Sequence, residues 1–286
     1  MPSILAIHGV GQQSTFANLL HRDWWPEIAK GLKLAGAEQF GPEELSCPYY
    51  GDLFLRHGVL SNNEMLNEED MDGLDEELMM EMWQFATLNE PDRVISPAAY
   101  ASDRSLTSYH PWLQSAANSL LSSRYFSGMA KGMMLGDLKQ VNRYINDRHL
   151  RDQAVERVTS QLGPEIRVVI GHSLGSVVAY EALCCCPHHV DTFITLGSPL
   201  GIKKLIFDQL QPAPVNDVGQ WPGVNIWLNV ADSGDLVAMK KKLASFFGER
   251  VEDLIVDNGW KAHDGTKYMG QKEIGAAVAK ALCQKN

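Results

Sequence analysis

The stretch that decides the fold is RVVIGHSLGSVVAYEAL, residues 167–183. Its first half contains Val168-Val169-Ile170, a short apolar run of β-branched residues that is typical of a strand buried on both faces. After Ser173 the apolar residues are spaced as on one face of a helix. The chain must therefore change from strand to helix within a few residues. It places Gly171 and Gly175 two positions on either side of Ser173.

The pattern Gly-x-Ser-x-Gly has a mechanical explanation at such a turn. The turn is so tight that the serine backbone is strained and its hydroxyl projects clear of the sheet. A Cβ at either glycine would collide with the neighbouring strand or helix. The free N–H groups at the start of the following helix point toward the serine. Ser173 is therefore the candidate nucleophile, and the alternative is an ordinary helix N-cap.

Short apolar runs alternate with helical patterns along most of the chain. Strands are expected over residues 3–8, 45–50, 166–170, 191–196, 225–230 and 251–256, and helices over 16–35, 138–162, 174–185 and 271–284. This alternation predicts an α/β fold with a mostly parallel six-stranded sheet that is flanked by helices on both sides.

Residues 52–136 interrupt the alternation and contain no convincing parallel strand. Helical patterns over 74–88 and 112–135 flank a stretch broken by prolines. Since a structureless loop of this length is improbable, we predict a helical cap or lid over 52–136, inserted into a core domain formed by 1–51 and 137–286. The interval holds eight of the eleven methionines, at positions 65, 71, 79, 80, 82, 129, 133 and 134. They would either fill a small core of the cap or line an acyl pocket or moving lid.

Charge and composition exclude several classes of partner. The net charge is −10, and the segment between Arg56 and Arg93 has eleven Asp or Glu residues and no Lys or Arg, which suggests a solvated helix face. Such a surface argues against nucleic acids and anionic membranes as partners. No apolar run reaches the roughly 18 residues of a membrane span, so stable membrane insertion is not expected. The N-terminus MPSILAIHGV lacks a basic leader, and the adjacent Cys184-Cys185-Cys186 suggest reduced thiols, so we expect a cytoplasmic protein.

A serine nucleophile needs a base and a carboxylate that orients the base, and on this kind of sheet they follow in the order Ser, Asp, His. Asp232 and Asp235 come just after the strand expected at 225–230. His263 comes after the strand expected at 251–256, and the other histidines fit helices, the cap or motif turns. Both loops should lie at the carboxyl edge of the sheet. His263 is therefore the expected base, and either aspartate could orient it.

The loop after the first strand, LAIHGVGQQS at residues 5–14, is expected to complete an oxyanion hole. One N–H donor would come from Leu174, directly after the nucleophile, and the second from Val10, whose flanking glycines let the backbone approach a substrate. His8 should support this turn, and His172 should shape the pocket. The loop also resembles the start of a dinucleotide fingerprint, but Ser14 replaces the third glycine. No metal or organic cofactor is implied.

Taken together, these motifs resemble those of serine hydrolases with the α/β-hydrolase fold, of the lipase/esterase kind. The matching segments are HGVG at 8–11, GHSLG at 171–175, LGSPLG at 196–201, Asp235-Leu236-Val237, and the pair His263 and Tyr268. In that family the acidic residue is usually followed directly by short aliphatic residues, as Asp235 is followed by Leu236 and Val237, which favours Asp235 over Asp232. The chain departs from the family in lacking two leading antiparallel strands and in carrying its cap unusually early.

The resemblance implies a carboxyl-ester hydrolase that acts through an acyl-enzyme on a small-molecule or lipid ester. The catalytic residues would be Ser173, Asp235 and His263, with Val10 and Leu174 as the oxyanion hole. The same arrangement also serves thioesterases, amidases, serine peptidases, acyltransferases and lipases that act at lipid interfaces. A hydrolase fold kept as a binding module without catalysis is a further alternative.

Overall fold

The computed structural model describes residues 1–55, 71–102, 111–126 and 129–283. Its centre is a six-stranded sheet of order β2-β1-β3-β4-β5-β6 in which every neighbouring pair is parallel. The strands are β1 (Ile4–Ile7), β2 (Leu45–Ser46), β3 (Val168–His172), β4 (Thr192–Leu196), β5 (Ile226–Asp232) and β6 (Val251–Val256). Each of the six expected segments contributes a strand, so the prediction of a parallel six-stranded α/β sheet is confirmed.

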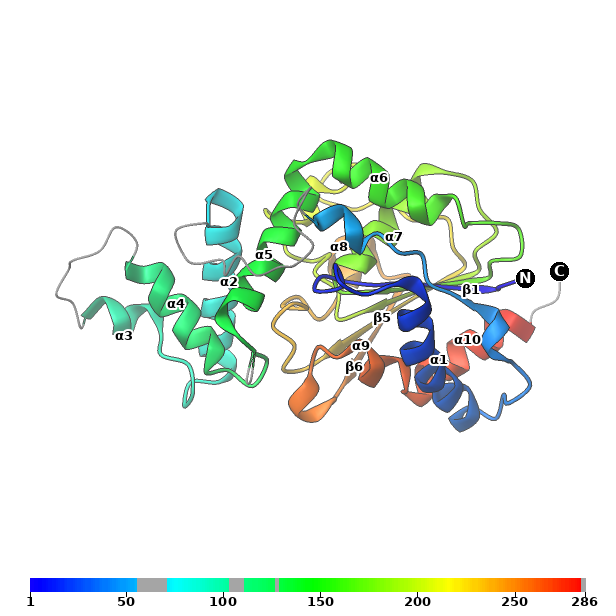
Figure 1. The fold of residues 1–286 in the computed structure, drawn as a ribbon, viewed down its shortest axis with the longest axis horizontal. Helices are drawn as coiled ribbons and strands as arrows, with labels where there is room; N and C mark the ends of the chain where they lie inside the picture. Colours follow the sequence, from blue (N-terminus) through cyan, green and yellow to red (C-terminus); the bar gives the residue numbers. More distant parts are fainter. Residues whose placement is uncertain (56–70, 103–110, 127–128, 284–286) are drawn as a thin grey trace.

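Helices cover both faces of the sheet (Figure 1). On one face lie α1 (Ala17–Leu34), α9 (Gly265–Met269) and α10 (Lys272–Cys283), and on the other lie α6 (Arg148–Thr159) and α7 (Leu174–Cys185). Strand β1 illustrates why a strand in the middle of this sheet has an uninterrupted apolar sequence. Ile4 and Ala6 belong to the hydrophobic cluster of the first face, whereas Leu5 and Ile7 belong to that of the second. Successive side chains point to opposite faces, and both faces are buried.

Four helices form a cap at one end of the molecule: α2 (Gly73–Asn89), α3 (Pro97–Ser102), α4 (Pro111–Leu121) and α5 (Lys131–Asn146). Figure 1 shows them at the end opposite the N-terminus, where the parallel strands have their carboxyl ends. Helix α5 runs through the expected boundary at 136. Met79, Met82 and Met134 of the cap are buried in the same hydrophobic cluster as α7, so the cap packs directly onto the core. Met65 lies outside the described residues.

Two predicted helices are wrong in their extent. The helix expected over 112–135 is divided, because α4 ends at Leu121 and α5 begins at Lys131. Between them the Ser123 hydroxyl donates to the Leu120 carbonyl at 2.6 Å, a local bond that competes with helix continuation. The helix expected over 138–162 is divided at Asp147, whose carboxylate accepts the Leu150 N–H at 3.1 Å and caps α6.

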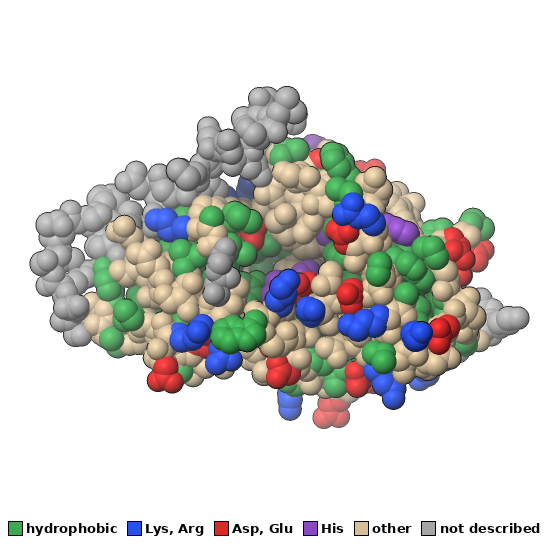
Figure 2. All heavy atoms as spheres, turned by 60° about the horizontal axis from the view of Figure 1, so that its bottom comes forward, with side chains coloured by type: hydrophobic (Ala, Val, Ile, Leu, Met, Phe, Trp, Pro, Cys, Tyr) green, Lys and Arg blue, Asp and Glu red, His purple; other side chains and the backbone are tan. Residues whose placement is uncertain are grey.

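Acidic side chains of α2 also contribute to the packing of the cap. Lys139 of α5 lies 2.8 Å from a carboxylate oxygen of Asp75, which is fully buried, and 3.1 Å from Asp72. The expectation of a wholly solvated acidic face is therefore wrong for Asp75. On the face drawn in Figure 2, basic and acidic side chains are interspersed over the core. Across the described parts of the chain, no helix combines the length and the apolar character needed to cross a bilayer.

A buried ion pair fastens α6 to α7. Arg151 Nε donates to Glu181 Oε2 at 2.9 Å, and a second guanidinium nitrogen contacts Oε1. The Tyr144 hydroxyl and the Gln211 N–H donate to the same carboxylate, at 2.6 and 3.0 Å. Glu181 is therefore held by three elements of the structure.

Removing the cation of this pair should destabilise the fold strongly. In Arg151→Met the Glu181 carboxylate stays buried without its charge partner, so we expect the free energy of unfolding to fall by about 3–5 kcal/mol in a denaturant titration. The double variant with Glu181→Leu should recover much of this loss. Arg148→Met, which breaks an exposed pair with Asp152, is the matched control and should change little. A comparable loss in both single variants would contradict the interpretation.

Candidate active site

Ser173 stands on the turn between β3 and α7 with φ 53° and ψ −130°. A positive φ is strained for a residue with a side chain and is maintained only where the surroundings impose it. A Cβ on Gly171 would lie 2.5 Å from the Cα of Ser176, and one on Gly175 would lie 2.3 Å from the His8 carbonyl oxygen. The prediction that both flanking positions require glycine is therefore confirmed.

The loops after β5 and β6 bring Asp235 and His263 together. His263 Nδ1 lies 2.7 Å from Asp235 Oδ2, and because a carboxylate only accepts, the proton of this bond is on Nδ1. His263 Nε2 is thereby left as the atom that can accept a proton. It is buried and has no hydrogen-bond partner among the described residues. Asp232 does not reach the imidazole and instead accepts the N–H groups of Gly234 and Asn258.

The environment of Asp235 keeps its carboxylate charged. Burial by itself would raise its pKa, but the charge and hydrogen bond of His263, with smaller effects of Lys241 and Tyr268, lower the pKa to about 2. Tyr268 donates its hydroxyl to Oδ2 at 2.8 Å. Since the folded pKa is depressed, the stability that this carboxylate contributes is present above about pH 4 and is lost as the pH falls toward 2.

Ser173 lies at the same sheet edge as this pair. Its N–H donates to the Leu196 carbonyl at 3.0 Å, and a Cβ on the next residue, Gly197, would lie 2.9 Å from His263 Nδ1. The ring of His172 is centred 4.7 Å from that of His263, and its Nε2–H donates to the His263 carbonyl at 2.7 Å. Within the described residues no hydrogen bond joins Ser173 Oγ to His263 Nε2. Such a bond is often long without substrate and tightens in the complex.

The turn that carries Val10 lies against the serine. A Cβ on Gly9 would lie 2.6 Å from the Cβ of Ser173. Among the backbone hydrogen bonds of the described loops and turns, none is donated by the Val10 N–H or the Leu174 N–H. His8 holds the turn, with Nδ1–H donating to the Gly9 carbonyl at 2.8 Å, and burial lowers the pKa of His8 to about 4. His8 is thus a neutral residue of the turn.

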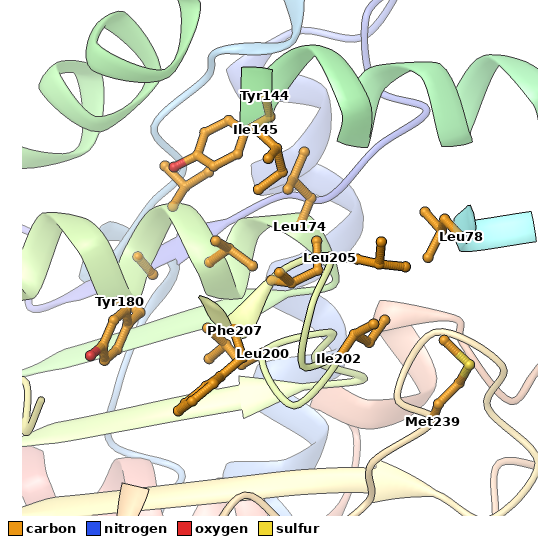
Figure 3. Packing of buried hydrophobic residues seen from close by; sticks show 14 of the residues in the cluster. Leu78, Tyr144, Ile145, Leu174, Tyr180, Leu200, Ile202, Leu205, Phe207 and Met239 are labelled. Carbon is orange, nitrogen blue, oxygen red and sulfur yellow. The ribbon is translucent and has the colours of Figure 1, made fainter. Parts of the chain in front are cut away.

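A cavity lies between the cap and the core, and Ser173, Val10 and Leu174 line it. Its walls are mainly apolar. Leu78 comes from α2, whereas Leu174, Ile202 and Met239 come from the core (Figure 3). Met82 and Met134 also line the cavity, so methionines of the cap contribute both to the shared core and to the cavity wall.

The cap also contacts the histidine loop at two points. Inside, the ring of Tyr125 is centred 5.3 Å from that of His263. Outside, the guanidinium carbons of Arg93 and Arg124 each lie 5.4 Å from the centre of the Trp260 ring, within the range of cation–π attraction. The cap therefore packs against both sides of the loop that carries His263.

Sequence reasoning missed two polar groups of the site. Asp137 of α5 and Tyr125 line the cavity, but Tyr125 falls within the helix expected over 112–135 and Asp137 falls between that helix and the one expected over 138–162. A third residue, Tyr268, was expected only as part of a motif. Its hydroxyl accepts the Asp232 N–H at 2.7 Å while it donates to Asp235.

Tyr268→Phe should therefore affect both folding and activity. The buried Asp232 N–H loses its acceptor, so we expect a loss of about 1–3 kcal/mol in the free energy of unfolding. Asp235 also loses one of the donors that fix it against His263, so kcat should fall for the ester hydrolysis that the sequence predicts. Tyr180→Phe is the control, because it removes a hydroxyl bonded to the Gln220 carbonyl and should lower stability without lowering kcat. Equal kcat values for the two variants would exclude a role of Tyr268 in orienting the acid.

Comparison with known proteins assigns no family to this chain. No protein-family model, no curated protein and no solved structure matches it. The residues of the site are therefore interpreted from their own chemistry and geometry.

Proposed function

We propose that the chain is a serine hydrolase with the α/β-hydrolase fold that cleaves carboxylic esters through an acyl-enzyme. The observation that carries this proposal is the 2.7 Å hydrogen bond between His263 Nδ1 and Asp235 Oδ2. It leaves His263 Nε2 buried, with no hydrogen-bond partner in the described part of the chain, at the sheet edge where Ser173 occupies its strained turn. A histidine oriented by a carboxylate, with its second nitrogen able to accept a proton, has the arrangement of a general base.

In the first half of the reaction, Ser173 Oγ attacks the ester carbonyl carbon and its proton passes to His263 Nε2. The carbonyl π electrons move to the oxygen, and this oxyanion accepts the N–H groups of Val10 and Leu174. Asp235 stabilises the imidazolium. When the carbonyl reforms, the bond to the alcohol oxygen breaks, and that oxygen takes the proton from Nε2. The acyl group is left on Ser173.

In the second half, water replaces the alcohol. His263 Nε2 takes a proton from the water, whose oxygen attacks the acyl carbon, and the bond to Ser173 Oγ then breaks. The proton returns to Oγ, so that the carboxylic acid leaves and the enzyme is regenerated. The cavity beside Ser173 supports this scheme, because its mainly apolar lining suits the organic part of an ester.

The proposal is tested by labelling with a fluorophosphonate and by turnover of p-nitrophenyl butanoate. We expect the phosphonyl adduct on the peptide that contains Ser173, and hydrolysis of the butanoyl ester faster than that of the matching thioester or amide. Faster cleavage of the thioester or amide would change the reaction class. A rise in rate above the micellar limit of a lipid ester would assign an interfacial lipase. The absence of both labelling and turnover would refute an enzyme and favour a binding module.

A further inference from the structure

Asp137 is the single carboxylate among the described residues that line the cavity, where the other polar side chains are Ser173 and Tyr125. It projects from α5 against the turn that carries Val10, since a Cβ on Gly11 would lie 3.3 Å from Asp137 Oδ1. The charge of His263 also acts on it. Asp137 therefore lies against the turn of Val10, one of the proposed oxyanion donors, and lines the same cavity as the proposed nucleophile Ser173.

The protein provides Asp137 with little hydrogen bonding. Its one described contact is with Gln140 Nε2, at 3.5 Å from Oδ1, which is at the limit of a hydrogen bond. The amide oxygen of Gln140, Oε1, accepts the Gly11 N–H at 3.3 Å. No Lys or Arg is among the described residues lining the cavity. A carboxyl at the wall of an apolar cavity without a strong partner is a group that a ligand can satisfy.

We propose that Asp137 selects esters whose alcohol part carries a second hydroxyl next to the ester oxygen, that is, partial esters of diols or polyols. The inference rests on the proposed hydrolase function. In that reaction the oxyanion faces Val10 and Leu174, and the leaving alcohol faces His263 Nε2. Since Asp137 lines the same cavity as Ser173 and the charge of His263 acts on it, it is placed to meet the alcohol part of the substrate.

The ionisation of Asp137 favours a neutral hydroxyl over a charged group. Burial raises its pKa to about 7, although the charge of His263 acts in the opposite direction. Both forms are therefore populated near neutral pH. A hydroxyl can accept a hydrogen bond from the carboxylic acid or donate one to the carboxylate, so it serves both forms. A cationic group would need the carboxylate form, and an anionic group would be repelled by it.

The test compares two esters of equal heavy-atom number, 2-hydroxyethyl butanoate and propyl butanoate, which differ by a hydroxyl in place of a methyl. We expect the wild type to prefer the hydroxyethyl ester about tenfold in kcat/KM, the effect of one net hydrogen bond to a buried group. Asp137→Asn keeps a donor and an acceptor and should retain most of this preference. Asp137→Leu keeps the size without polar atoms and should abolish it.

The ratio of the two esters within each variant cancels any general loss of activity, and Asp137→Ala replaces the leucine variant if that one does not fold. An unchanged ratio in Asp137→Leu would overturn the role of Asp137, while hydrolysis of the propyl ester would still support the proposed function. If the wild type preferred 2-(dimethylamino)ethyl butanoate to the hydroxyethyl ester, and if Asp137→Asn lost that preference, Asp137 would select a cationic group and the proposed selection of a hydroxyl would be wrong. Failure of the wild type to hydrolyse any of these esters or to react with a fluorophosphonate would refute both proposals.

Discussion

Replacing Ser173 with alanine is expected to lower kcat for p-nitrophenyl butanoate by roughly 10⁴- to 10⁶-fold. The variant has no Oγ to form the acyl-enzyme, and only the oxyanion donors and the cavity remain to assist direct attack by water. Steady-state hydrolysis measures the effect, and labelling by a fluorophosphonate should disappear with it. Turnover close to that of the wild type would remove Ser173 as the nucleophile.

The backbone at Ser173 provides a structural control for this variant. Alanine is strained as much as serine by a backbone φ of 53°, so the thermal unfolding midpoint of Ser173→Ala should stay close to that of the wild type. Glycine adopts this conformation without strain, so Ser173→Gly should be about 1 kcal/mol more stable and equally inactive. A large loss of stability in Ser173→Ala would mean that the loss of activity reflects unfolding.

The second large effect is expected for Asp235→Asn, which should lower kcat by about 10⁴-fold with little change in KM. The amide of asparagine can donate to His263 Nδ1, which favours the tautomer with its proton on Nε2. That nitrogen then cannot accept the proton of Ser173. The fold should persist, because the side chain keeps its size and the oxygen that accepts the N–H groups of Val237 and Ala238.

Asp232→Asn is the matched control, because Asp232 is the last residue of β5 and Asp235 lies in the loop that follows directly. Asp232 accepts backbone N–H groups and does not contact the imidazole, so its variant should lose stability and keep kcat within about tenfold of the wild type. A larger loss of kcat in Asp232→Asn than in Asp235→Asn would show that the acid is assigned to the wrong residue.

The sheet could be predicted from the sequence because its inner strands, β1, β3, β4 and β5, are buried on both faces. Such strands are unbroken apolar runs, and the run at 168–170 is the clearest of them. Helix ends were harder to predict, since an amphipathic pattern continues across Asp147 although its carboxylate caps a new helix there. Whether a polar side chain bonds to the backbone in this way depends on local geometry that periodicity does not reveal.

The sequence by itself determined the parallel sheet and the strained turn at Ser173, because a buried strand followed directly by a helix leaves few conformations for the Gly-x-Ser-x-Gly segment. Only the tertiary structure decided between Asp232 and Asp235, since both follow the same strand and only one reaches the imidazole of His263. It also decided that Asp137 of the cap faces the cavity. These are contacts between distant segments, and they depend on how loops and helices pack, which no local pattern of residues specifies.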